Sequence, residues 1–239
     1  MIKNLLIAAF SCLTPFFVCG QQFALNEIVK IDTEKGIDIK YPIFTYKNPD
    51  VSAKVNQKIK YVFYEYSSVD AREKIENAID SAINIAMTDF YADVPFRNND
   101  ILCVQLHYEA MVAYPSSWTE YYNFSGYGNI LTIDSLIAPS KMIIFKSLLE
   151  KKQAVNIKNA IANFKDFKSF LDAVSGNCMD HYDPSKFFIT DTGLTVIIDC
   201  DFPHVIQSMN PNTYVFFSIT ELKGIFTRDK YFSLNKPRH

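Results

Sequence analysis

The spacing of hydrophobic residues changes along the chain, and each change predicts a different kind of element. Two short β-favouring stretches, 27–32 and 37–41, are joined by Thr33-Glu-Lys-Gly36, which is typical of a tight turn. Asn48-Pro49-Asp50 then has the residues of a helix start, and a first helix follows. A second helical pattern runs from about Val69 to Phe90. Its expected buried stripe consists of Ile75, Ile79, Ala82, Ala86 and Phe90.

Pro95 closes this helical region, and a β-favouring block follows it. The stretch from Ile101 to Tyr108 is expected to be a central strand, whose successive side chains alternate between two faces. One face is expected to carry Leu102, Val104, Leu106 and Tyr108, and the other Ile101, Cys103, Gln105 and His107.

The same block predicts a meander that leads into a helix. Pro115-Ser-Ser117 is expected to break the sheet before a strand from Trp118 to Phe124. A turn at Gly126-Tyr-Gly-Asn129 and a returning strand from Ile130 to Ile133 complete the meander. A third helical region begins near Ser140 and extends, with a break, towards Gly176.

The last part of the chain has the pattern of strands again. Lys186 to Thr190 and Leu194 to Asp199 flank a glycine-containing turn, which predicts a hairpin, and 213–217 is a further strand. Ser218-Ile-Thr-Glu221 has the spacing of a capping box and is expected to begin a short last helix that extends to Phe226.

Helices and strands therefore come in clusters and do not alternate strictly. This order predicts an α+β fold with a mixed or antiparallel sheet and helices clustered between the strand blocks. The chain has 239 residues, of which half are apolar. A chain of this length can bury a substantial core, so we expect one large domain or two small ones that share a sheet.

The amino terminus predicts export from the cytoplasm. Met1 to Asn4 carries one positive charge, Leu5 to Val18 is almost entirely apolar, and polar residues begin at Gln21. This is the pattern of a secretory signal peptide over 1–20, and the apolar run is too short for a bilayer-spanning helix. We expect a periplasmic or secreted protein with no membrane span after cleavage. A lipoprotein acylated at Cys19 is the less favoured alternative, because bulky residues precede that cysteine.

Charge and composition exclude several kinds of partner and cofactor. The formal net charge is −2, and loss of Lys3 with the signal peptide makes it −3. Without a basic run to follow phosphates, nucleic acid is not expected as a partner. Glycine is scarce, with 7 copies, and Gly126-Tyr-Gly-Asn129 lacks the third glycine and the helix of a nucleotide-binding loop. No cofactor is expected.

Three cysteines remain after the signal peptide: Cys103, Cys178 and Cys200. An odd number permits at most one intramolecular bridge, and Cys178 and Cys200 are the preferred pair because they flank one strand-like stretch. Three buried thiols that act as small hydrophobic side chains are nevertheless favoured over any bridge.

Candidate catalytic and metal-binding groups are present, but their spacing does not favour either function. The densest sets of potential ligands are 178–183 and 199–204, and strand alternation points Cys200 away from its neighbouring aspartates. No metal site is expected. Cys103, His107 and Ser116 lack the surroundings of a nucleophile site. No catalytic residue is therefore assigned.

An aromatic stretch is the stronger functional candidate. Its six rings within fourteen residues are Tyr114, Trp118, Tyr121, Tyr122, Phe124 and Tyr127. Tyrosine and tryptophan offer large contact areas with a polar tip, which suits sugar stacking and protein interfaces. Alternation places Trp118, Tyr122 and Phe124 on one strand face and Tyr121 on the other. The expected ligand-binding residues are Trp118, Tyr121, Tyr122 and Tyr127.

Several of these segments together resemble a known family. Tyr122 to Leu136 has the pattern of a strand, a glycine turn, a second strand and then an acidic residue and a leucine where the chain leaves the sheet. The segments 187–194, 201–204 and 214–222 follow it in the family's order. This arrangement is similar to the extracytoplasmic RsiV-like domain. After the signal peptide at 1–20, the resemblance implies an amino-terminal β-rich and helical segment at 21–95 and the RsiV-like α+β domain at 96–239.

The family implies binding, with any chemistry carried by other domains. Its members include the outer sensor region of lysozyme-responsive anti-sigma factors and an accessory domain beside peptidoglycan deacetylases. We therefore expect a non-enzymatic protein of the cell envelope that recognises a glycan, a peptidoglycan fragment or a protein such as lysozyme. The alternative is an envelope hydrolase built from dispersed acids and His181 or His204. The chain departs from many relatives in having Phe202 and Asn210 where they have a tyrosine and a glycine.

Overall fold

A computed structural model gives the fold of the chain. It describes residues 23–67, 70, 74–111, 114–163, 178–200 and 213–234. The expected signal peptide, Phe202, His204 and Asn210 lie outside the described residues. So does the part of the third helical region that was expected beyond residue 163.

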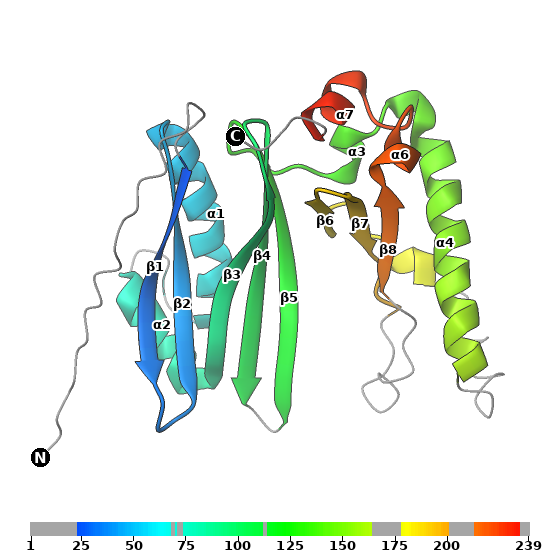
Figure 1. Ribbon diagram of the computed structural model, residues 1–239. Helices are drawn as coiled ribbons and strands as arrows, with labels where there is room; N and C mark the ends of the chain where they lie inside the picture. Colours follow the sequence, from blue (N-terminus) through cyan, green and yellow to red (C-terminus); the bar gives the residue numbers. More distant parts are fainter. Residues whose placement is uncertain are drawn as a thin grey trace, which may run out of the picture.

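A five-stranded sheet in the order β1-β2-β3-β4-β5 forms the centre of the molecule (Figure 1). Its strands are β1 (Phe23–Asp32), β2 (Ile37–Tyr46), β3 (Met87–Arg97), β4 (Ile101–Met111) and β5 (Pro115–Ser125). Neighbouring strands are antiparallel except β2 and β3, which are parallel. A parallel pair needs a crossover connection, and α1 (Pro49–Ser67) with α2 (Ile75–Ile85) provides it. The predicted α+β class with a mixed sheet is confirmed.

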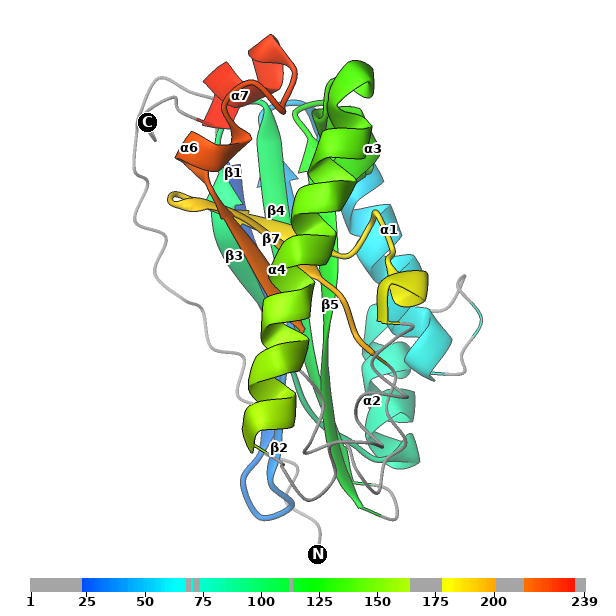
Figure 2. The same cartoon turned by 90° about the vertical axis from the view of Figure 1, so that its right-hand side faces the viewer.

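A second, three-stranded sheet lies against the other face of the first. It consists of β6 (Phe187–Thr190), β7 (Gly193–Ile197) and β8 (Tyr214–Ser218), all antiparallel. The helix α4 (Met142–Asn163) covers this small sheet as the outermost layer (Figures 1 and 2). Asn123 of β5 donates from Nδ2 to the Phe187 carbonyl oxygen at 2.6 Å, so a buried hydrogen bond ties the two sheets together.

Short helices complete the carboxyl-terminal half. They are α3 (Ile133–Leu136), α6 (Ile219–Leu222), α7 (Arg228–Leu234) and the 3-10 turns Pro139–Lys141 and Cys178–His181. The capping box predicted at Ser218 is confirmed, because its hydroxyl accepts from the Glu221 backbone while Glu221 accepts from the Ser218 backbone. The hairpin predicted between the strands at 186–190 and 194–199 is confirmed as β6–β7.

The two faces of β4 belong to two different hydrophobic cores. Leu102, Val104, Leu106 and Tyr108 face α1 and α2, as predicted from alternation. Ile101 and Cys103 face the other way, into the core formed with β6, β7 and α4. This explains why apolar residues occur at both sets of positions in one strand. The sequence boundary expected at residue 95 lies within β3, in the middle of the shared sheet.

The prediction of a helix that extends to Phe90 is wrong. Helix α2 ends at Ile85, and Ala86 adopts a positive φ of 126° while its N–H bonds to the carbonyl groups of Ala82 and Ile83. Phe90 instead lies buried in β3, opposite Tyr108. Its spacing from Ala82 and Ala86 fits a helix as well as a strand, so pairing with β4 decides the outcome.

Four further boundaries differ from the prediction. Pro95 lies inside β3, at a register shift between Asp93 and Phe96 where the missing N–H costs no ladder bond. The edge strand β5 begins at Pro115 rather than at Trp118. Of the strand expected over 130–133, only Ile130 forms a β-bridge. The helix expected to extend to Phe226 is α6, which ends at Leu222.

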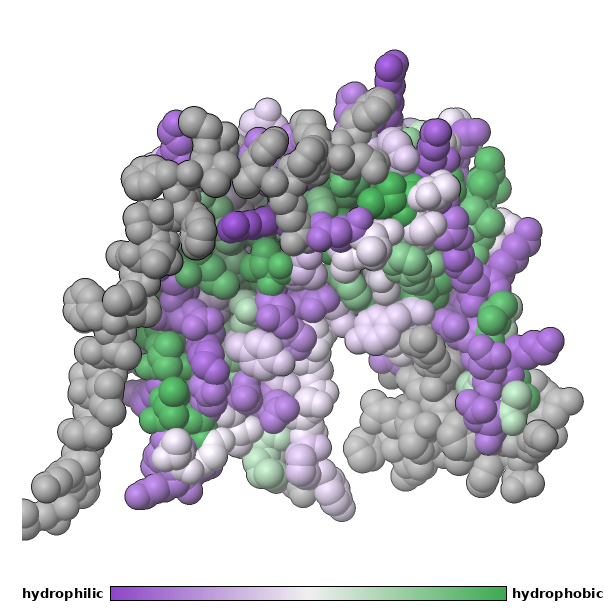
Figure 3. Space-filling view, viewed as in Figure 1, coloured by the Kyte–Doolittle hydropathy of each residue, from purple (hydrophilic) through white to green (hydrophobic). Residues whose placement is uncertain are grey.

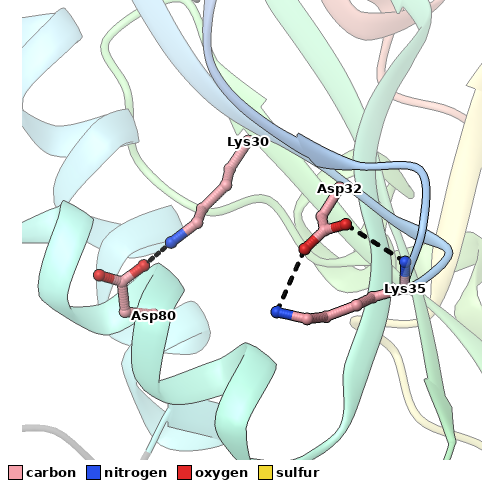
Figure 4. A network of polar contacts seen from close by, with 4 residues as sticks. All are labelled: Lys30, Asp32, Lys35 and Asp80. Carbon is pink, nitrogen blue, oxygen red and sulfur yellow. Dashed lines mark hydrogen bonds and ion pairs between the residues drawn. The ribbon is translucent and has the colours of Figure 1, made fainter. Parts of the chain in front are cut away.

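Polar contacts fix the first hairpin to the helices behind it. Lys30 reaches from β1 to Asp80 on α2 as an ion pair, and Asp32 accepts from Lys35 across the β1–β2 turn (Figure 4). The ammonium of Lys35 lowers the pKa of the Asp32 carboxyl from its ordinary value. Within the described ranges, no helix has the length and apolar character to cross a bilayer.

Candidate functional site

The aromatic rings singled out in the sequence are divided among three environments. Trp118 and Tyr122 lie on the face of β5 that packs against α1, and Tyr121 lies on the opposite face, as alternation predicts. Tyr127 lies in the turn after β5 and has 77% of its surface exposed. The structure therefore does not bring the four expected residues together in one site.

Trp118 and Tyr122 belong to a packed cluster around one carboxylate. The Trp118 ring stacks on Tyr108 with centroids 5.1 Å apart. Glu120 accepts hydrogen bonds from the hydroxyls of Tyr66, at 2.5 Å, and Tyr122, at 2.7 Å. Burial, followed by the bond to Glu120, raises the pKa of Tyr66 to about 12 and also raises the pKa of Tyr122. These contacts hold β5 against α1 and use the hydroxyls that a ligand would need.

Tyr121 forms part of a different group of rings, where the two sheets meet. Its ring stacks on Phe188 of β6 at 5.6 Å, and its hydroxyl lies 3.2 Å from the hydroxyl of Tyr214 on β8. Burial and this hydrogen bond raise the pKa of Tyr121. Tyr214 and Phe216 remain 48% and 44% exposed. Three strands from two sheets thus present a partly exposed aromatic surface.

Polar groups continue this surface across the five-stranded sheet. His107 of β4 stacks on Tyr91 of β3 at 4.5 Å. Its Nδ1 lies 3.1 Å from the Thr119 hydroxyl, and its Nε2 lies 3.2 Å from the Asp93 carboxylate. The Nε2 atom is buried and makes no hydrogen bond to the described residues, although the Asp93 carboxylate lies close to it. The ring lies next to Gln105, which pairs with Tyr121.

We call this region the inter-sheet corner. It consists of Tyr91, Asp93, Gln105, His107, Thr119, Tyr121, Phe188, Tyr214 and Phe216. In Figure 3 polar side chains gather over the five-stranded sheet, and the molecular surface is indented beside the lower half of β5, below the three-stranded sheet. A concave surface with rings on one side and hydrogen-bonding groups on the other suits a ligand that stacks and also accepts and donates hydrogen bonds.

Carboxylates lie next to the corner on the same sheet face. Asp38, Asp89 and Glu109 are register partners across β2, β3 and β4, and Lys40 bonds Asp38 at 2.6 Å. Burial, and then the charges of Asp38 and Glu109, raise the pKa of Asp89. Among the described residues, no group of three or more histidine, cysteine or acidic side chains is arranged to hold a metal ion.

The cysteines offer no nucleophile in the part of the chain that the structure describes. Cys178 and Cys200 form a disulfide, with Cα atoms 4.4 Å apart. Cys103 is buried, and burial raises the pKa of its thiol to about 12, so the thiolate required for catalysis is not formed near neutral pH.

Most residues of the corner do not stand out as functional in the sequence. Phe188, Tyr214 and Phe216 are predicted only as strand residues, although exposed Tyr214 and Phe216 alternate with buried Val215 and Phe217. That alternation was the available signal. Tyr91 could not be found, because its segment was assigned in part to a helix.

Comparison with known proteins identifies solved structures that have the same fold. No family model and no curated protein matches the sequence. A DUF3298 family member from Bacteroides fragilis superposes with a TM-score of 0.57 at 12% identity, over 90% of this chain and 98% of that one. A DUF3298 family protein from Pseudomonas aeruginosa superposes with a TM-score of 0.53 at 13% identity, over 88% and 95%. The chain thus shares its fold with DUF3298 proteins, the family of RsiV-like domains.

Proposed function

We propose that the protein is a non-enzymatic binding protein of the cell envelope, secreted or periplasmic, that belongs to the RsiV-like family. Its ligand is a glycan, a peptidoglycan fragment or a protein such as lysozyme. The observation that carries the proposal is the inter-sheet corner, where Tyr121, Phe188 and Tyr214 form a partly exposed aromatic surface beside fixed polar groups. Such surfaces are typical of sites for sugars and for protein partners.

Two independent lines support membership of the family. The motifs between Tyr122 and Leu136 and in the last third of the chain resemble the family in order and character. The fold matches DUF3298 proteins over nearly their whole length. Export is supported by the apolar leader before Gln21 and accords with a role in the envelope.

An envelope hydrolase is the second candidate, and one observation favours it. Asp89 has a raised pKa and lies beside Asp38 and Glu109, as an acid in a glycosidase would. A hydrolase also needs a second catalytic group, a free base positioned across the substrate from the acid, and the described residues do not supply a clear one. Asp38 is bonded to Lys40, and His107 contacts Thr119 through Nδ1 while its Nε2 is buried beside the Asp93 carboxylate. Binding therefore accounts for more of the arrangement than hydrolysis does.

The test measures retention of the protein from Gln21 onward on insoluble peptidoglycan and on immobilised lysozyme. We expect retention on at least one of them, and Tyr214→Ala should weaken it about tenfold, because a buried ring at the centre of an interface contributes roughly 1–3 kcal/mol. Tyr214→Phe keeps the ring and separates stacking from the hydroxyl contact to Tyr121.

Ile85→Ala is the control, since Ile85 is an exposed apolar residue at the end of α2, on the opposite side of the five-stranded sheet and outside both proposed sites. A loss of retention caused by Ile85→Ala but not by Tyr214→Ala would remove the corner as the site. Release of soluble muropeptides that is abolished by Asp89→Asn would establish the hydrolase instead.

A further inference from the structure

A second surface with binding character lies on α1, away from the inter-sheet corner. A shallow depression follows this helix and is lined by Lys54, Gln57, Lys58, Lys60 and Tyr61. The residues at 54, 58 and 61 are one helical turn apart, so they form a single stripe. Tyr61 is 57% exposed although it is a large aromatic residue.

The turn after β5 places a second exposed tyrosine beside this stripe. Gly128 has a φ of +77°, and a Cβ at its position would lie 3.1 Å from the Cβ of Lys54 and 3.2 Å from the Val51 carbonyl oxygen. The turn is therefore packed directly on α1. Lys54 also donates from Nζ to the Tyr127 carbonyl oxygen at 3.4 Å. Tyr127 is thus held next to the helix while its ring projects into solvent.

The two lysines of the stripe differ from four other lysines that are engaged by carboxylates. Lys30, Lys35, Lys40 and Lys152 each have a carboxylate within 4.0 Å. Within the described ranges, Lys54 and Lys58 make no such ion pair. Lys58 instead lies 5.5 Å from the Tyr61 ring centroid and 5.4 Å from that of Tyr122. Its ammonium is therefore positioned by two rings and remains available to an anion.

Carboxylates limit the size of the positive region. Asp50 precedes Lys54 by one turn, Glu65 follows Tyr61 by one turn, and Glu120 is engaged by tyrosine hydroxyls beneath the surface. Two ammonium groups between acidic flanks suit a ligand with one or two negative charges. They do not suit a nucleic acid, because it presents a charge about every 1.7 Å and needs a longer basic track.

We propose that Lys54, Lys58, Tyr61 and Tyr127 form a second binding site, and that its ligand is an acidic saccharide. The exposed rings of Tyr61 and Tyr127 stack on the apolar faces of sugar residues, and the two ammonium groups pair with sugar carboxylates. This site is separate from the inter-sheet corner and does not depend on the function proposed for it.

The experiment compares two probes with the same sugar backbone, one charged and one neutral: tetragalacturonate and its fully methyl-esterified form. Binding to the purified protein is measured by isothermal titration at low and at physiological salt. We expect the acid to bind about fivefold or more tightly than the ester, with the difference reduced by salt, because exposed ion pairs are screened. The double variant Lys54→Gln/Lys58→Gln should abolish the difference, and Tyr127→Ala should weaken both probes.

Lys151→Gln is the matched control, since Lys151 is an exposed lysine on α4, and it should change nothing. Equal binding of acid and ester would overturn the role assigned to the lysines. If neither probe bound, the proposal that the ligand is a saccharide would be overturned. A single-stranded oligonucleotide that binds more tightly than tetragalacturonate through the same lysines would overturn the ligand class. Binding that is lost in Tyr214→Ala but retained in the double lysine variant would place the saccharide in the inter-sheet corner and overturn the second site.

Discussion

Neighbouring residues on β5 reach different surfaces, although they share one short segment. Tyr121 contacts Phe188 and Tyr214, whereas Tyr122 bonds Glu120 on the other side of the sheet. Alternation predicts this division from the sequence, because successive strand side chains point to opposite faces. It does not predict which face stays open, because rings occur on both faces and the cover comes from α1 and β6, far away in the chain.

Close backbone approach makes Gly193 the residue whose replacement has the clearest expected cost. A Cβ there would lie 2.0 Å from the Phe217 carbonyl oxygen and 2.9 Å from the Phe216 ring, so β7 and β8 would have to separate. We expect Gly193→Ala to lower the free energy of unfolding by about 1–3 kcal/mol, as overpacking does. Urea denaturation followed by circular dichroism measures this.

Thr192→Ala is the matched control for this substitution, because Thr192 is an exposed residue of the same turn. Its effect should stay within about 0.5 kcal/mol, as is usual for surface changes. Equal stabilities of Gly193→Ala and the unmodified protein would contradict the close approach of β8 to this glycine.

At the level of elements, the sequence predicts strands best where period and turn residues agree. The first hairpin, β4 and the β6–β7 hairpin follow from alternation and glycine turns. The stretch 86–97 does not, because its apolar spacing fits both periods. Only the pairing of β3 with β2 and β4 settles it, and that pairing depends on residues distant in sequence. The corner was missed for the same reason, since it forms where β5, β6 and β8 meet.

The disulfide is the element-level link whose removal can be tested directly. Cys178 and Cys200 are 22 residues apart, and the bridge joins the 3-10 turn at Cys178–His181 to the residues after β7. Closing a loop of this length stabilises a fold by about 3 kcal/mol in the chain-entropy model. We expect Cys178→Ser/Cys200→Ser to lose roughly this amount in urea denaturation.

Reduction provides the control for that loss. A thiol reductant should destabilise the unmodified protein by a similar amount and leave the double variant unchanged. Cys103 is a free, buried thiol and remains in the double variant, so it serves as an internal reference that reductant should not affect. If reductant left the urea midpoint of the unmodified protein unchanged, and that midpoint equalled the one of the double variant, the bridge would not form in solution.

For the whole molecule, one sheet that serves two cores is the dominant feature. Length and composition predict enough apolar material for a substantial core, but they do not predict its division across β4. The three-stranded sheet does not extend to the lower half of β5, and the surface is indented there (Figures 1 and 3). The core on the helix side also buries many tyrosines. Burial raises the pKa of each of Tyr41, Tyr46, Tyr66, Tyr108 and Tyr122.

These tyrosines should make the protein sensitive to alkali. An ordinary tyrosine ionises near pH 10, so the unfolded chain loses its phenolic protons there while the folded chain keeps them. The folded state then binds more protons than the unfolded state, and the free energy of unfolding must fall as pH rises above about 10. Below pH 10 both states are protonated and this contribution is fully present. Urea denaturation at half-unit steps from pH 8 to pH 11 measures the decline.

Tyr41→Phe isolates the cause of that decline. Tyr41 is 6% exposed, and burial raises its pKa more than its neighbour Tyr64 does. Removing its hydroxyl removes one group that titrates differently in the two states, so the variant should lose stability less steeply above pH 10. Parallel curves for the two proteins would mean that Tyr41 ionises as readily in the fold as in the unfolded chain, which is incompatible with its place in the core between Phe63 and Phe90.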